Sequence, residues 1–174
     1  KTNGTWSSTS DITDLNNPVL FISVIDENTL ISASLDKILR IWEKSNGAWI
    51  NTDNLTGHNG YFRGVSKADE NTIVSSSYED SLVKVWTKVD GRWGSASDIL
   101  LNKEKAVSAF IFDDNTVVSA SSDNMINIWT KTGDKWLNTE NIIGGGSGIN
   151  YVSKIDSNSI IAGYGSGLLE VWSN

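Results

Sequence analysis

The chain has 174 residues, of which 14 are Lys or Arg and 21 are Asp or Glu, so its formal net charge at pH 7 is −7. This acidic balance disfavours general binding to nucleic-acid phosphates or anionic lipid, and we expect neither a nucleic-acid nor a membrane partner. The chain has no cysteine and one histidine, which excludes disulfides and leaves most metal and acid–base sites without their usual side chains. We therefore expect no metal and no cofactor.

Eight tryptophans reveal an internal repeat of 43 to 44 residues. They form two series that run in step, one at Trp42, Trp86, Trp129 and Trp172 and the other at Trp6, Trp49, Trp93 and Trp136. The period divides the whole chain into four units, 1–43, 44–87, 88–130 and 131–174. Because the four units account for every residue, we predict one domain, 1–174.

In each unit, the sequence pattern predicts four short antiparallel strands. The first hairpin turns at an Asp-x-Asn motif, at Asp26–Asn28, Asp69–Asn71, Asp113–Asn115 and Asp156–Asn158. A short strand follows, "TLISAS", "TIVSSS", "TVVSAS" or "SIIAGY", and then an alternating strand that ends at the first tryptophan series. A turn that contains Gly leads to the fourth strand, and no segment has a helical period. The sequence therefore predicts an all-β protein.

The units are related in alternate pairs, which indicates duplication of a two-unit block of 87 residues. Units one and three share Trp-x-Ser-x-Ser-Asp-Ile, at 6–12 and 93–99. Units two and four share Trp-x-Asn-Thr-acidic-Asn-aliphatic, at 49–55 and 136–142. This pattern is evidence about symmetry rather than about chemistry.

A unit of this length that ends in Ile/Val-Trp, with a turn Asp six residues earlier, resembles the WD-repeat β-propeller family. The best unit is the second, where Gly57-His58, Asp80 and Trp86 match the family motif and Ser75 or Ser77 could supply its hydroxyl. The resemblance implies that these side chains form a hydrogen-bonded chain within the blade. The set is broken in the other units, because the His position is Leu15, Asn102 or Gly145 and the last Asp becomes Ser166.

The resemblance implies a β-propeller of four-stranded antiparallel blades, with four blades in this chain. Its first strand, Gly4–Ile12, is expected to be the outermost strand of a blade, and its last, Leu168–Trp172, a third strand. Blades of this length usually form rings of seven or eight, so four are few. We expect a homodimer that completes an eight-bladed ring, in which each first strand lies beside the other chain's last strand. A tight four-bladed ring is the alternative.

Catalysis is not supported by the motifs, and we predict that the protein is not an enzyme. His58 is the only histidine and fits the structural Gly-His of the repeat. Gly144–Gly148 lacks the Gly-Lys-Ser/Thr of a phosphate loop, which favours an inter-blade loop. Asp113–Asn115 coincides with a repeated turn and lacks the spacing of a calcium site.

Binding is better supported, on the loop face around the expected central channel. The candidate residues there are Tyr61, Arg63, Tyr78, Tyr151 and Tyr164. We expect a scaffold that binds a protein or peptide; for the tyrosines, packing between strands is an equal alternative. A second class is a lectin with one glycan site per blade, on Trp6, Trp49, Trp93 and Trp136, although these rings can equally pack between strands. A third is an excised or engineered repeat fragment with no ligand.

Overall fold

The structure is a computed structural model that describes residues 11–12, 15–94, 97–100 and 104–174. Every regular element in this part of the chain is a β-strand, as the sequence predicts. No helix in these ranges has the length and apolar character needed to cross a membrane.

The strands form four antiparallel sheets, which we call blades 1 to 4 in chain order. Blade 1 consists of β1 (Val19–Asp26), β2 (Thr29–Ser34), β3 (Leu39–Ser45) and β4 (Ala48–Leu55). Blade 2 consists of β5 (Phe62–Asp69), β6 (Thr72–Ser77), β7 (Leu82–Val89), β8 (Arg92–Trp93) and β9 (Ser97–Leu100). Blade 3 consists of β10 (Ala106–Asp113), β11 (Thr116–Ser121), β12 (Met125–Thr132) and β13 (Lys135–Ile143). Blade 4 consists of β14 (Ile149–Lys154), β15 (Ser159–Tyr164) and β16 (Leu169–Ser173).

The Asp-x-Asn motifs form the first hairpin turn of every blade. In each, the Asp carboxylate accepts a hydrogen bond from the backbone N–H of the Asn two residues later, with N···O distances of 2.7, 2.6, 2.9 and 2.8 Å in blades 1 to 4. The third and fourth strands of blade 1 join through Asn46-Gly47, where both residues have positive φ, as a tight hairpin requires. The predicted turns are therefore confirmed.

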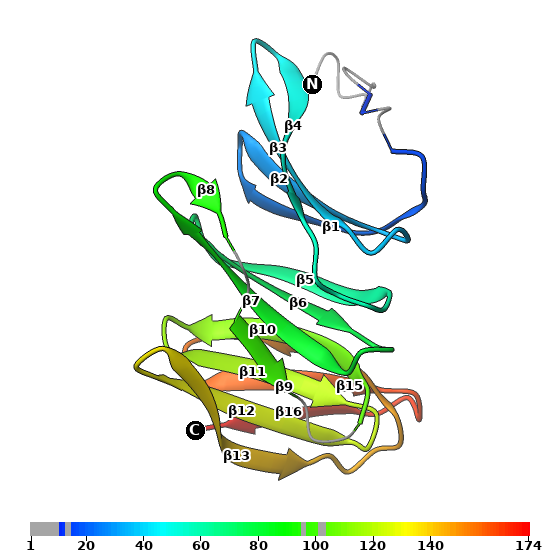
Figure 1. Cartoon of the computed structure of the whole chain (residues 1–174). Helices are drawn as coiled ribbons and strands as arrows, with labels where there is room; N and C mark the ends of the chain where they lie inside the picture. The colour runs from blue at the N-terminus through cyan, green and yellow to red at the C-terminus, as the bar shows by residue number, and fades with distance from the viewer. Residues whose placement is uncertain (1–10, 13–14, 95–96, 101–103) are drawn as a thin grey trace, which may run out of the picture.

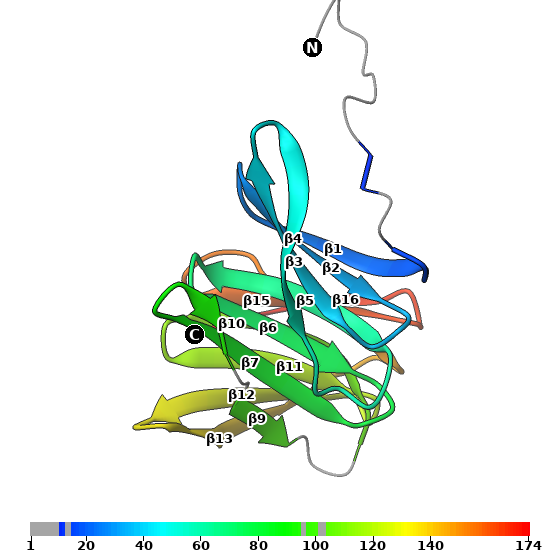
Figure 2. The same cartoon turned by 45° about the horizontal axis from the view of Figure 1, so that its top comes forward.

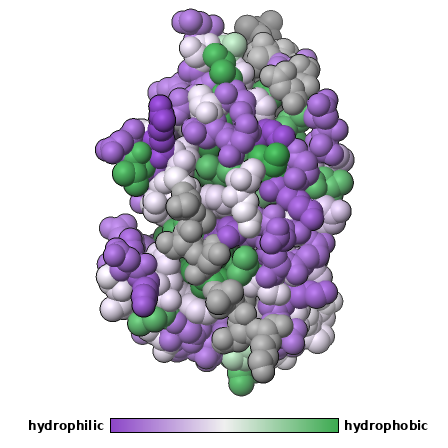
Figure 3. Space-filling model, in the orientation of Figure 1, coloured by the Kyte–Doolittle hydropathy of each residue, from purple (hydrophilic) through white to green (hydrophobic). Residues whose placement is uncertain are grey.

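The blades are arranged in an open row. Their first strands lie next to one another in the order β1, β5, β10 and β14, and blade 1 stands at one end with its β3–β4 hairpin projecting away from the other blades (Figures 1 and 2). No comparable packing joins blade 4 to blade 1 in the part of the chain that the structure describes. The surface in Figure 3 is mainly hydrophilic, with hydrophobic side chains in separate patches.

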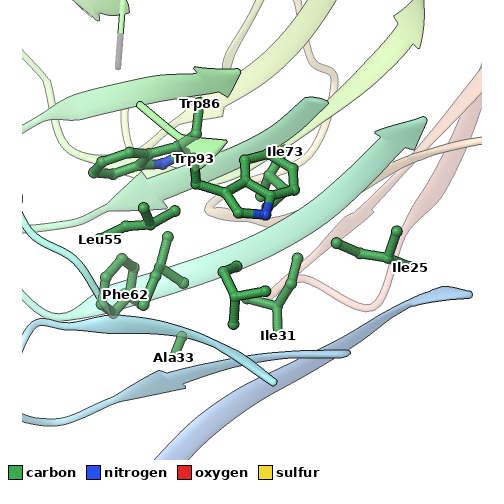
Figure 4. Packing of buried hydrophobic residues seen from close by; sticks show 10 residues of the cluster. Ile25, Ile31, Ala33, Leu55, Phe62, Ile73, Trp86 and Trp93 are labelled. Atoms are coloured by element: carbon green, nitrogen blue, oxygen red, sulfur yellow. The ribbon is translucent and has the colours of Figure 1, made fainter. Parts of the chain in front are cut away.

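The hydrophobic core consists of three clusters, one between each pair of neighbouring blades. Between blades 1 and 2, the Trp93 ring from β8 lies among Ile25, Ile31, Leu55 and Trp86 (Figure 4). Between blades 2 and 3, Trp136 from β13 packs in the corresponding place. Trp93 and Trp136 therefore fill gaps between sheets, and truncating a fully buried tryptophan should cost about 3–5 kcal/mol.

Two blades differ from the four-strand prediction. In blade 2 the outermost strand is split, because β8 pairs with the end of β7 while β9 pairs with its beginning. In blade 4 the described residues supply only three strands, of which β16 carries Trp172. The predicted strand Gly4–Ile12 lies outside the described residues except for Asp11 and Ile12.

Candidate functional site

Blade 2 contains a complete hydrogen-bonded chain of four side chains. His58 is buried; its Nδ1 lies 2.8 Å from Asp80 Oδ2 and its Nε2 lies 2.9 Å from Ser75 Oγ. Ser75 Oγ also accepts the indole N–H of Trp86 at 2.8 Å, so Ser75, rather than Ser77, supplies the hydroxyl. Both nitrogens of His58 are thus engaged in structural contacts, as expected for a structural histidine.

The same chain fixes the ionisation of Asp80. Burial alone would raise the pKa of this carboxyl, but the hydrogen bond and charge of His58 outweigh it. Backbone N–H groups of Leu82 and Asn59 also stabilise the carboxylate, and together these groups lower the pKa of Asp80 to about 2. Asp80 is therefore an ionised structural group near neutral pH rather than a proton donor.

The other blades keep only parts of this network. Trp42 and Trp129 donate to Ser32 and Ser119, each at 2.8 Å. In blade 4 the hydroxyl position is Ala162, which removes the acceptor for the Trp172 indole. These differences agree with the motif losses that the sequence indicates.

Three of the predicted binding residues line one hollow of about 370 Å³ at the loop end of blades 1 and 2. They are Tyr61, Arg63 and Tyr78. Leu20 and Leu35 of blade 1 form its apolar side, and Glu79 accepts a hydrogen bond from the Tyr61 backbone N–H. Tyr61 is 43% exposed, whereas Tyr78 is half-buried against the cluster between blades 3 and 4.

Positively charged side chains surround these tyrosines. The Arg63 guanidinium carbon lies 5.0 Å from the centre of the Tyr78 ring, and Lys105 Nζ lies 4.4 Å from the same centre. Lys37 Nζ lies 5.6 Å from the Tyr61 ring centre and donates to Asn59 O at 2.7 Å. Sequence reasoning missed Lys37 and Lys105. The repeat register could have identified Lys105, because it directly precedes β10 as Tyr61 precedes β5.

The remaining two predicted binding residues lie elsewhere. Tyr151 is 57% exposed on β14 and lines a separate hollow with Phe110 and Lys154. Tyr164 is buried in the cluster between blades 3 and 4, where burial and the neighbouring Glu170 carboxylate raise the pKa of its phenol. The register places Tyr164 with the buried Ser77 rather than with Tyr78, and its ring lies buried against the loop Gly144–Gly148 instead of being exposed on the loop face.

The tryptophans considered for a lectin are largely occupied by packing in the described part of the chain. Trp93 is buried, and Trp136 packs against the cluster between blades 2 and 3. Trp49 is half-buried beneath Lys44, whose Nζ lies 5.9 Å from its ring centre. These contacts favour the packing interpretation. Among the described residues, no group of three His, Cys, Asp or Glu side chains is positioned to hold a metal ion.

The four sheets, which repeat one strand order along the chain, define a repeat protein of the β-propeller type. The family model "WD domain, G-beta repeat" matches residues 49–87 and 102–130, within the second and third units. These two segments are divergent WD repeats. A search of curated proteins finds no match.

Two solved structures illustrate the shared fold. The crystal structure of the computationally designed Ika4 protein is 20% identical, with a TM-score of 0.75 over 97% of this chain and 99% of that chain. The crystal structure of the WD40 β-propeller domain of Doa1 is 23% identical, with a TM-score of 0.73 over 91% of this chain. The match covers 51% of the Doa1 chain, so this chain spans about half its length.

Proposed function

We propose that the protein is a non-catalytic scaffold that binds a protein or peptide at the hollow formed by Tyr61, Arg63 and Tyr78. The observation that carries this proposal is the stacking of two cations, Arg63 and Lys105, on the single Tyr78 ring at the edge of the hollow. Tyrosine and arginine are enriched among residues that dominate binding energies. The apolar side of the hollow gives a partner side chain a surface on which to pack.

The charges favour an acidic segment as the ligand. Neither Arg63 nor Lys105 forms an ion pair with a carboxylate among the described residues. The acid that lines the hollow, Glu79, accepts the Tyr61 backbone N–H, and Glu104, next to Lys105 in sequence, accepts a hydrogen bond from Ser122 Oγ at 3.3 Å. A carboxylate from a partner would therefore meet unpaired cations on a chain whose net charge is −7.

The test compares binding of short peptides of opposite net charge to the wild-type chain and to Arg63→Ala and Tyr78→Ala. We expect acidic peptides to bind better than basic ones, and each substitution to weaken binding by about tenfold or more. Lys44→Ala is the matched control, because it also removes a cation stacked on an aromatic ring but on the outer part of blade 1. Unchanged affinity in both variants would exclude this surface.

We also propose that two copies of the chain close an eight-bladed ring. Support comes from the two end faces of the row, where apolar side chains are exposed at positions that are buried inside it. On β16, Leu169 is 69% exposed, whereas its counterparts Leu39, Val83 and Ile126 are all 0% exposed. On β1, Ile22 is 67% exposed, whereas its counterpart Val152 is 1% exposed. Exposed apolar faces of this kind favour association.

Light scattering across a concentration series tests ring closure. A closed ring of two copies gives about 38 kDa, twice the 19.0 kDa of one chain. A mass that stays at 19.0 kDa at every concentration would contradict the dimer.

A further inference from the structure

A hollow of about 660 Å³ lies between blades 3 and 4. Its apolar lining comes from both blades: Phe112, Val118, Ile128 and Ile142 of blade 3, and Ile160 and Trp172 of blade 4. These side chains belong to or border the hydrophobic cluster that joins the two blades. The hollow is therefore an opening in the core between two sheets rather than a surface groove.

The corresponding place between blades 1 and 2 is filled. In the repeat register, the six apolar lining residues correspond to Ile25, Ile31, Ile41, Leu55, Ile73 and Trp86. All six belong to one buried cluster, and the side chain that lies among them is Trp93 (Figure 4). Trp93 comes from the outermost strand of blade 2 and is 8% exposed. The hollow between blades 3 and 4 is thus lined like the site of Trp93, but among the described residues no tryptophan side chain occupies it.

The repeat identifies Trp6 as the missing side chain. Trp93 begins the segment Trp-x-Ser-x-Ser-Asp-Ile, and Trp6 begins the only other copy of it. Trp93 also precedes Ala106, the first residue of β10, by the same number of residues as Trp6 precedes Val19, the first residue of β1. By this register, Trp6 belongs to the blade that lies before blade 1 in a ring.

Among the described residues of one chain, no blade lies before blade 1: β1 has β5 of blade 2 beside it, and Ile22 of β1 is exposed. We propose that the hollow between blades 3 and 4 is the binding site for Trp6 of a second copy. This proposal rests on the ring closure proposed above. The segment that follows Trp6 in the second copy then pairs with β16 of the copy that holds the hollow, as the outermost strand of its blade 4. Each copy donates one strand and receives one.

The pairing of β9 with β7 supplies the register. Ser97 lies opposite Val85 and Ile99 lies opposite Val83. The equivalent pairs are Ser10 with Val171 and Ile12 with Leu169 of the partner copy. In the ring, blade 1 of the partner copy follows β16 and covers Leu169 and Val171, both exposed in the single chain, as blade 3 covers Val83 and Val85. Ring closure by two copies thus accounts both for the hollow and for the exposed face of β16.

A disulfide tests this register directly, because the natural chain has no cysteine. Opposite residues on antiparallel strands have Cβ atoms about 4.5–5.5 Å apart, close enough for a disulfide after a small adjustment. We expect the double variant Ser10→Cys, Val171→Cys to form a covalent dimer on oxidation, seen on a non-reducing gel. The control is Ser10→Cys, Lys135→Cys, in which the second cysteine lies on the exposed start of β13.

A disulfide within one chain would overturn the proposal, as would a yield of covalent dimer no higher than in the control. The mass of the wild-type chain separates the proposal for Trp6 from the proposal of ring closure. A dimer mass without the disulfide means that the ring closes but Trp6 does not fill the hollow, whereas a monomer mass contradicts both.

A second measurement tests the tryptophan itself. Trp6→Ala should raise the dimer dissociation constant by roughly 100-fold or more, because it leaves a cavity in each of two interfaces. Trp6→Phe should have a smaller effect, and Thr5→Ala should have almost none. Equal dissociation constants for all four chains would overturn the assignment of Trp6 to the hollow.

Discussion

The single histidine shows how a polar side chain can be structural in an all-β protein. His58 connects the loop before β5 to the hairpin before β7, and its two nitrogens join a carboxylate to a hydroxyl in a buried place. A buried polar group that loses its partner costs about 1–3 kcal/mol, more if it is charged. In blades 1 and 3, which lack the histidine, the aspartate has another partner: Asp36 pairs with Arg40, and Asp123 accepts a hydrogen bond from Ser121 Oγ.

The depressed pKa of Asp80 gives a pH-dependent prediction. Because the folded pKa of about 2 lies below the unfolded value of 3.8, the ionised carboxylate stabilises the fold above pH 3.8. This contribution, about 1–2 kcal/mol after allowance for partial solvent screening, is lost as the pH falls toward 2. Asp80→Asn should therefore lower the free energy of unfolding at pH 5, and its difference from wild type should shrink as the pH falls to 2.

Chemical denaturation at several pH values measures this difference. Ser75→Ala is the control, because it removes the hydroxyl of the same chain without removing a titrating group. Its effect on the free energy of unfolding should change little over the same range. A constant difference between Asp80→Asn and wild type would contradict the pKa assignment.

At the scale of strands and turns, local patterns were sufficient to predict the structure. The four Asp-x-Asn hairpins depend on residues close in sequence, and the structure confirms them. The strand that carries each tryptophan of the first series also forms, but it continues one to three residues beyond the predicted end. What the sequence did not reveal depends on contacts between distant segments. Lys105 reaches Tyr78 only because blades 2 and 3 pack together. The burial of Tyr164 depends on a loop twenty residues earlier.

That loop is Gly144–Gly148, and its glycines serve packing in blade 4. A Cβ atom on Gly144 or Gly146 would overlap the Tyr164 ring, and one on Gly145 would overlap the Glu170 carboxylate. Gly145 N–H donates to Glu170 Oε2 at 2.8 Å, at the position where blade 2 has His58. A large buried tyrosine has thus replaced the small buried serine of the other blades, and the glycines provide its space.

We predict that Gly144→Ala lowers the free energy of unfolding by about 1–3 kcal/mol, because the added methyl group overlaps the Tyr164 hydroxyl. Combining it with Tyr164→Phe should restore part of this loss, since the hydroxyl is the nearest atom. A thermal or denaturant double-mutant cycle measures the coupling. Gly94→Ala is the control: its Cβ would lie 3.5 Å from Thr87 O, an ordinary contact. Additive effects of the two substitutions would show that the ring and the loop are independent.

At the scale of the whole molecule, the row of blades repeats one interface and leaves half of it open at each end. The position of Leu169 shows this, because the same site is fully buried wherever another blade follows. A charge introduced there should therefore affect association far more than folding. We predict that Leu169→Glu changes the free energy of unfolding of the single chain by no more than about 0.5 kcal/mol.

The same substitution should abolish the dimer, because a ring of two copies buries position 169 against an apolar face and leaves the carboxylate without a partner. Leu137→Glu is the matched control, since Leu137 is also an exposed leucine, on β13. Light scattering of both variants should give a monomer mass for Leu169→Glu and the wild-type mass for Leu137→Glu. If Leu169→Glu keeps a dimer mass, that dimer does not use the face of β16, and two copies would have to associate through another surface. If it unfolds the chain, Leu169 is part of the folding core, and the open end of the row is not a free interface.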